Sequence, residues 1–184
     1  MLSNIIKNGG LGFRRKKVTF NGVPSILIKD GFLIELGSGC TLNSQNIGYH
    51  LNMHSCVKLI ADCKGAKIKI GSQTRIHGSC VHARNYIEIG KRCLIAANCQ
   101  IIDSNGHEAK ITNPEKRILS KGVSKPIIIE DDVWLGAGVK VLAGAHIGRG
   151  SVVGTVTVVT GFIPPMSIVV GQTCKVVAKV NDNL

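Results

Sequence analysis

Aliphatic residues recur at every sixth position through the C-terminal third of the chain, and this spacing restricts the fold more than any other feature. An α-helix needs apolar residues three and four positions apart, and a simple strand alternates every two. A period of six fits short strands joined by tight turns, with the aliphatic side chains directed at one axis. The series is Ile129, Leu135, Val141, Ile147, Val153 and Val159.

A second set of mostly small or β-branched residues lies four positions after each aliphatic residue, from Val133 to Ile163. The same frame recurs earlier, as Ile70, Ile76 and His82, and then Ile89, Ile95 and Ile101 after one extra residue. It predicts that His82 and three cysteines (Cys80, Cys93 and Cys99) point inward. Residues 36–42 match the six-residue repeat more weakly and indicate that the coils begin near residue 34. The register of the repeat in residues 43–65 stays open.

Composition agrees with a narrow interior, because aromatic residues are 4% of the 184 residues and glycines number 22. The seven cysteines form no CxxC pair and are expected to be small buried hydrophobes rather than a disulfide framework or zinc site. No apolar run is long enough for a membrane helix and no signal peptide is recognisable, so we expect a cytoplasmic protein.

The formal net charge of +12 indicates anionic partners. Nucleic acid is not an expected partner, because its binding motifs and interleaved aromatic residues are missing. The basic run at 14–17 has two interpretations, a weak contact with an anionic membrane or a solvated charge run.

Four stretches (70–74, 89–96, 133–138 and 147–154) resemble the hexapeptide-repeat acyltransferases, especially the maltose and galactoside O-acetyltransferase branch with its bacterial polysaccharide O-acetyltransferases. The resemblance covers about residues 66–180. It implies an all-β, left-handed parallel β-helix, a homotrimer and acetyl-CoA as donor. We expect a basic N-terminal segment or cap at 1–33, the β-helix at 34–172 with an extruded loop at about 103–126, and a C-terminal cap at 173–184.

The repeat stops after Ile101 and resumes by Ile129. This gap is longer than one coil of the solenoid, so the extra residues must leave it as a loop. The departing loop carries His107, at the place where the resembling family carries its catalytic histidine. Neutral imidazole suits a general base that removes a proton from a sugar hydroxyl as the oxygen attacks a thioester. The expected function is therefore O-acetylation of a bacterial saccharide, by direct transfer with His107 as base.

Other site residues are expected around this loop. Asp103 or Glu108 either orients the imidazole or is a solvated loop charge, and Asp103 is also a candidate for contact with the acceptor. Asn85 either meets the acceptor sugar or turns the chain. Trp134 either forms a flat wall for the sugar or cofactor, or is a packed surface aromatic.

The resemblance also implies donor-site residues along the C-terminal coils. Ala137, Thr155 and Thr160 correspond to contacts with the pantetheine arm, and Lys175 corresponds to a basic residue near the nucleotide phosphates. Lys179 is an alternative for the phosphate contact.

Three rival functions use the same repeat. A sugar-nucleotide N-acetyltransferase would differ in taking an amine acceptor, and a γ-class carbonic anhydrase would need three converging histidines, for which His77, His82 and His107 are the candidates. A passive scaffold would need no extruded loop. His50, His54, Cys56 and Cys63 match no standard zinc spacing, and no metal site is expected.

Overall fold

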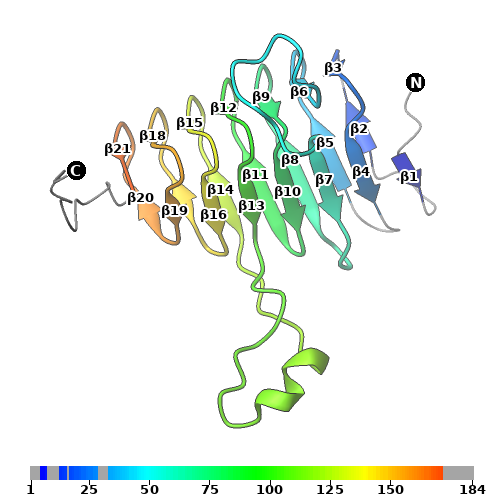
Figure 1. Ribbon diagram of the computed structural model, residues 1–184, viewed down its shortest axis with the longest axis vertical. Helices are drawn as coiled ribbons and strands as arrows, with labels where there is room; N and C mark the ends of the chain where they lie inside the picture. The colour runs from blue at the N-terminus through cyan, green and yellow to red at the C-terminus, as the bar shows by residue number, and fades with distance from the viewer. Residues whose placement is uncertain (1–4, 8–12, 16, 29–32, 172–184) are drawn as a thin grey trace, which may run out of the picture.

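The computed structural model describes residues 5–7, 13–15, 17–28 and 33–171. Short parallel strands form three sheets, A, B and C, which the chain visits in that order on every turn (Figure 1). Each sheet has seven strands, so the described chain makes seven coils. The architecture is a left-handed parallel β-helix of hexapeptide repeats, which confirms the expected fold class.

The strands are two to four residues long, as a period of six requires. Sheet A consists of β1 (Ile5–Lys7), β4 (Ser25–Ile28), β7 (Lys58–Ala61), β10 (Cys80–Ala83), β13 (Gln100–Ile102), β16 (Lys140–Leu142) and β19 (Val158–Val159). Sheet B consists of β2 (Phe13–Arg15), β5 (Leu33–Leu36), β8 (Lys67–Ile70), β11 (Tyr86–Ile89), β14 (Ile127–Ile129), β17 (His146–Ile147) and β20 (Phe162–Ile163). Sheet C consists of β3 (Thr19–Asn21), β6 (Thr41–Asn43), β9 (Arg75–His77), β12 (Leu94–Ile95), β15 (Trp134–Leu135), β18 (Val152–Val153) and β21 (Ile168–Val169).

Inward side chains from all three sheets form one continuous apolar column. The six aliphatic residues of the regular series, from Ile129 to Val159, are all buried, as their spacing predicts. Each coil covers the interior of the next, so the core depends on stacking rather than on any single turn.

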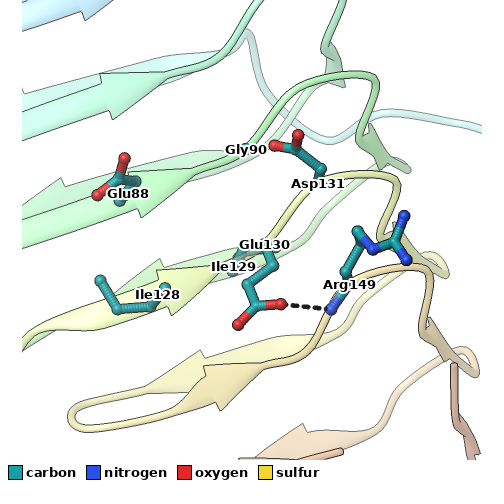
Figure 2. Close-up of a pocket in the computed structure, with 7 residues that line it drawn as sticks. All are labelled: Glu88, Gly90, Ile128, Ile129, Glu130, Asp131 and Arg149. Atoms are coloured by element: carbon teal, nitrogen blue, oxygen red, sulfur yellow. Dashed lines mark hydrogen bonds between the residues drawn. The ribbon is translucent and has the colours of Figure 1, made fainter. Parts of the chain in front are cut away.

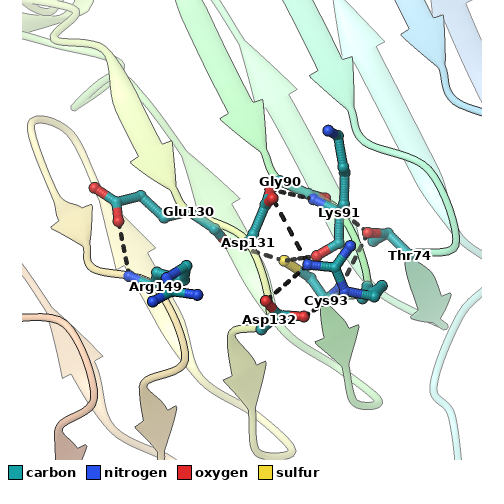
Figure 3. Close-up of polar contacts among 9 residues, drawn as sticks. Thr74, Gly90, Lys91, Cys93, Glu130, Asp131, Asp132 and Arg149 are labelled. Atoms are coloured by element: carbon teal, nitrogen blue, oxygen red, sulfur yellow. Dashed lines mark hydrogen bonds and ion pairs between the residues drawn. The ribbon is translucent and has the colours of Figure 1, made fainter.

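Small polar side chains connect successive coils where sheet B turns into sheet C, which we call the B/C corner. The Thr74 hydroxyl donates to the Gly90 carbonyl at 2.7 Å, and the Cys93 thiol donates to the Glu130 carbonyl at 3.1 Å (Figure 3). These inward groups satisfy turn carbonyls that no strand would otherwise pair. Cys93 and Cys99 are buried, in agreement with the sequence-based prediction.

The sequence-based boundary of the N-terminal segment is wrong. Strands β1 to β4 lie before residue 34, and they pair with strands of the next coils as β1 with β4, β2 with β5, and β3 with β6. The solenoid therefore already includes Ile5. Irregular turn lengths in this part of the chain hide the six-residue spacing.

The predicted inward positions of Cys80 and His82 are also wrong. Ser79 occupies the buried corner position, so the next inward residue is Val81, five positions after Ile76 instead of six. This short turn moves Cys80 and His82 to the outer face of sheet A, where His82 Nε2 lies 3.0 Å from an Asp62 carboxylate oxygen.

The chain leaves the solenoid twice (Figure 1). Residues 44–57 leave between β6 and β7, at the corner between sheets C and A (the C/A corner), and account for the open register of 43–65. Residues 103–126 leave between β13 and β14, at the corner between sheets A and B (the A/B corner), and project away from the body.

Candidate functional site at the extruded loop

The projecting loop begins as a two-stranded stem. Ser104 and Ser124 form an antiparallel bridge, and the Gly122 N–H donates to the Gly106 carbonyl at 2.8 Å. A 3₁₀ helix (Pro114–Leu119) closes the far end of the loop. The stem therefore holds the residue that follows Gly106, which is His107, in a defined position.

The imidazole of His107 is exposed and its Nδ1 faces two backbone carbonyls. Nδ1 lies 3.0 Å from the Arg117 oxygen and 3.1 Å from the Ser120 oxygen. A carbonyl oxygen only accepts hydrogen bonds, so Nδ1 must carry the hydrogen. In the neutral ring, Nε2 then holds the free lone pair. The sequence could not reveal these orienting groups, because every residue has a backbone carbonyl and the residue type does not show which carbonyl accepts a hydrogen bond.

Asp103 was expected to contact the acceptor, but its carboxylate is not accessible. The residue is completely buried, and its carboxylate accepts backbone N–H groups from Arg84, Asn85 and Tyr86 at 2.8, 2.8 and 2.9 Å. Burial raises the pKa of this carboxyl, while the three N–H donors act in the opposite direction. Asp103 anchors the base of the loop to the preceding coil and does not touch His107 through a hydrogen bond.

Two other predicted residues share the A/B corner with the loop. Asn85 has an exposed position in the turn between β10 and β11, and its backbone is one of those held by Asp103. Thr160 is exposed in the turn between β19 and β20. Both side chains are accessible on the edge from which His107 projects.

The remaining described candidates lie elsewhere on the same chain. Trp134 faces outward from sheet C, paired in register with Leu94 and Val152. Ala137 and Thr155 stack in successive turns of the C/A corner, where the Val156 N–H donates to the Ala137 carbonyl. One chain therefore does not bring these residues to His107. Lys175, Lys179 and the predicted C-terminal cap lie outside the described residues.

A hollow of about 350 Å³ lies on sheet B beside the B/C corner (Figure 2). Its wall includes Glu88, Glu130, Asp131 and Arg149, and none of the predicted site residues lines it. His146 lies 2.7 Å from Glu130, and this hydrogen bond lowers the pKa of the Glu130 carboxyl.

Within the described ranges, no three histidine, cysteine, aspartate or glutamate side chains are placed to hold a metal ion. His77 belongs to sheet C, His82 to sheet A and His107 to the loop, so the three histidines considered for a carbonic anhydrase do not converge in one chain.

Comparison with known proteins agrees with this architecture. Residues 126–161 match the family model described as the hexapeptide repeat of succinyl-transferase. The galactoside O-acetyltransferase of Lactococcus lactis is 37% identical over 97 residues, covering 53% of this chain and 45% of that protein. The chain is therefore similar to hexapeptide-repeat acetyltransferases over about half of its length.

Solved structures of other proteins are similar to this chain in three-dimensional fold. A hexapeptide-repeat acetyltransferase of Vibrio cholerae, complexed with acetyl coenzyme A, is 32% identical, with a TM-score of 0.52 over 62% of this chain and 61% of that chain. The N-acyltransferase AntD of Bacillus cereus covers 86% of this chain and 78% of that chain with a TM-score of 0.65, but at 18% identity it shows the fold alone.

The chain spans less than half the length of the curated relatives it matches, 30% of a probable acetyltransferase of Mycobacterium tuberculosis and 45% of the galactoside O-acetyltransferase. Among the described residues, no helix is long and apolar enough to cross a membrane.

Proposed function

We propose that this hexapeptide-repeat protein is an acetyl-CoA-dependent O-acetyltransferase that acts on a hydroxyl of a bacterial saccharide, with His107 as general base. The observation that carries the proposal is the hydrogen bonding of His107. Its Nδ1 is committed to the carbonyls of Arg117 and Ser120, and this leaves Nε2 as a proton acceptor on an exposed ring.

The proposed reaction is a direct transfer. Nε2 of His107 removes the proton of the acceptor hydroxyl as that oxygen attacks the thioester carbonyl. The tetrahedral intermediate then collapses, breaking the carbon–sulfur bond, and the imidazolium returns its proton to the departing CoA sulfur. The carbonyls at Nδ1 stabilise the imidazolium that forms between these steps, as an orienting group does in other base-assisted transfers. Because acetyl-CoA is a cytoplasmic metabolite, we expect the reaction there.

Replacing the base tests the proposal. His107→Ala is expected to lower kcat by about 10²- to 10⁴-fold, with little change in the KM for acetyl-CoA. His54→Ala is the matched control, because His54 is also exposed but lies in the loop of residues 44–57. Circular dichroism would check that both variants stay folded. Full activity of His107→Ala on a saccharide panel would exclude His107 as the base.

The proposed acceptor atom is an oxygen rather than a nitrogen, following the O-acetyltransferase relative. The alternative is a sugar-nucleotide N-acetyltransferase. Assaying a sugar beside its amino-sugar analogue separates the two, because a hydroxyl-specific enzyme needs the base for its weak nucleophile and should acetylate the sugar that has no amine.

We further propose that the functional unit is a homotrimer with the donor site between protomers. Sheet C carries an outward apolar row in which Leu94, Trp134 and Ile168 are 45%, 51% and 80% exposed. Such a row on a monomer indicates a contact surface. A second copy would also bring Ala137 and Thr155 to the His107 of its neighbour.

A further inference from the structure

Two cationic side chains flank the backbone beside His107. Arg84 extends from the turn after β10, and its Nη1 donates to the Gly106 carbonyl at 3.2 Å. The Nε of Arg84 is buried and has no hydrogen-bond partner within the described part of the chain. The Arg84 side chain as a whole is half-buried, and its terminal guanidinium nitrogens carry further N–H donors from which a bound anion can accept hydrogen bonds.

The second cation is Lys121, on the returning strand of the stem. Lys121 directly precedes Gly122, whose N–H donates to the Gly106 carbonyl, so the Lys121 backbone lies close to that of His107. Lys121 is exposed, so its ammonium is accessible on the stem that carries His107.

No nearby carboxylate pairs directly with either cation, although the positive charge of Arg84 contributes to the lowered pKa of the Asp62 carboxyl. Of the acids at this corner, Asp103 is committed to three backbone N–H groups, Asp62 pairs with His82 at 3.0 Å, and Glu108 pairs with Lys110 at 3.1 Å. Among the described residues, no carboxylate oxygen lies within 4.0 Å of Arg84 or Lys121.

We infer that the acceptor is an anionic saccharide, whose phosphate or carboxylate group binds Arg84 and Lys121 while its hydroxyl reaches His107. The inference rests on the proposed acetyl transfer. A guanidinium matches a two-oxygen anion in geometry, and an ammonium adds a point charge. The phosphates of CoA are a poorer match, because the pantetheine arm separates them from the thioester that must reach His107.

Binding of glucose, glucose 6-phosphate and glucuronate, measured by calorimetry on the full chain, tests the inference without turnover. At least one anionic sugar should bind about ten times more tightly than glucose, as expected for a hydrogen bond between charged groups. Arg84→Gln and Lys121→Gln should each remove most of this difference. The two anions distinguish a phosphate site from a carboxylate site.

Lys91→Gln is the matched control, since it removes one positive charge at the B/C corner, in the turn between β11 and β12, whereas the loop leaves the solenoid at the A/B corner. Equal binding of all three sugars would overturn the inference. It would also be overturned if Lys91→Gln weakened anion binding as much as Arg84→Gln, or if Arg84→Gln and Lys121→Gln raised only the KM for acetyl-CoA. Anion-dependent binding without acetyl transfer to any sugar would support the anion site and refute the proposed function instead.

Discussion

Asp103 shows how a polar residue in a loop can be structural even when it lies close to a candidate base. Its sequence position, four residues before His107, made it a candidate for contact with the acceptor. The buried carboxylate instead completes the hydrogen bonds of the turn at residues 84–86. Two of the three donors, Arg84 and Asn85, belong to the turn between β10 and β11, and the third, Tyr86, begins β11. The carboxylate therefore satisfies N–H groups where the chain changes sheets.

Asp103→Asn is expected to destabilise the protein by about 1.5–3 kcal/mol, because an amide places its own donor against N–H groups. Chemical denaturation would measure the loss. Asn85→Ala is the comparison at the same turn, and it should change stability by less than about 0.5 kcal/mol because the Asn85 side chain is exposed. Equal stability of Asp103→Asn and the wild type would contradict the anchoring role.

Two buried thiols give the stability of the protein a pH dependence. Burial raises the pKa of Cys93 and Cys99 to about 11, above the usual value of 9.0. As the pH rises above 9, the unfolded chain releases these protons before the folded one. Stability should therefore fall between pH 9 and 11, by up to about 1.4 kcal/mol per pH unit for each thiol.

Urea denaturation at several pH values, on the wild type and on Cys93→Ser with Cys99→Ser, would isolate this effect. Serine keeps a donor for the carbonyls of Glu130 and Gly136 but does not titrate in this range. The double variant should show a flatter decline above pH 9. Identical slopes in the two proteins would show that these thiols do not titrate as expected.

At the scale of the element, the packing of stacked turns at the corners determines which glycines can be replaced by a larger residue. A Cβ on Gly90 would lie 2.5 Å from the Asp131 backbone nitrogen in the next coil. That atom belongs to a stacked turn, so it can move only if the coil moves. A Cβ on Gly161, in contrast, would meet no atom within 4 Å.

Gly90→Ala should therefore cost about 1–3 kcal/mol of stability, as overpacked substitutions do. Gly161→Ala should be neutral or slightly stabilising, because alanine restricts the unfolded chain. Thermal unfolding of the two variants side by side would check this, and an equal effect of both would show that the coil spacing is looser than described.

The success of sequence-based prediction follows the regularity of these turns. From Ile129 to Val159 the turns have equal length, so six-residue spacing alone identifies the buried residues. At Ser79 one turn is shorter, and every inward assignment up to the next break shifts by one. Spacing also identified the loop that carries His107, but not its stem, because hydrogen bonds between backbone groups do not depend on residue type.

At the scale of the whole molecule, the candidate residues are divided between corners of the solenoid. His107 and Thr160 lie at the A/B corner, whereas Ala137 and Thr155 lie at the C/A corner, on the other side of sheet A. A rigid stacked core does not allow these corners to approach one another. A site that uses both His107 and Thr155 must therefore combine two chains.

Mixed oligomers provide the direct test of this shared site. His107→Ala removes the base, and Thr155→Arg places a bulky cation at an exposed turn where we expect the pantetheine arm. Each variant alone should be inactive. In a cyclic trimer assembled from equal amounts of both, about a quarter of the interfaces would pair an intact His107 with an intact Thr155 of the neighbour. Co-expressed chains should then recover about a quarter of wild-type activity, whereas a site contained in one chain would stay inactive at every mixing ratio, since every chain carries one defect.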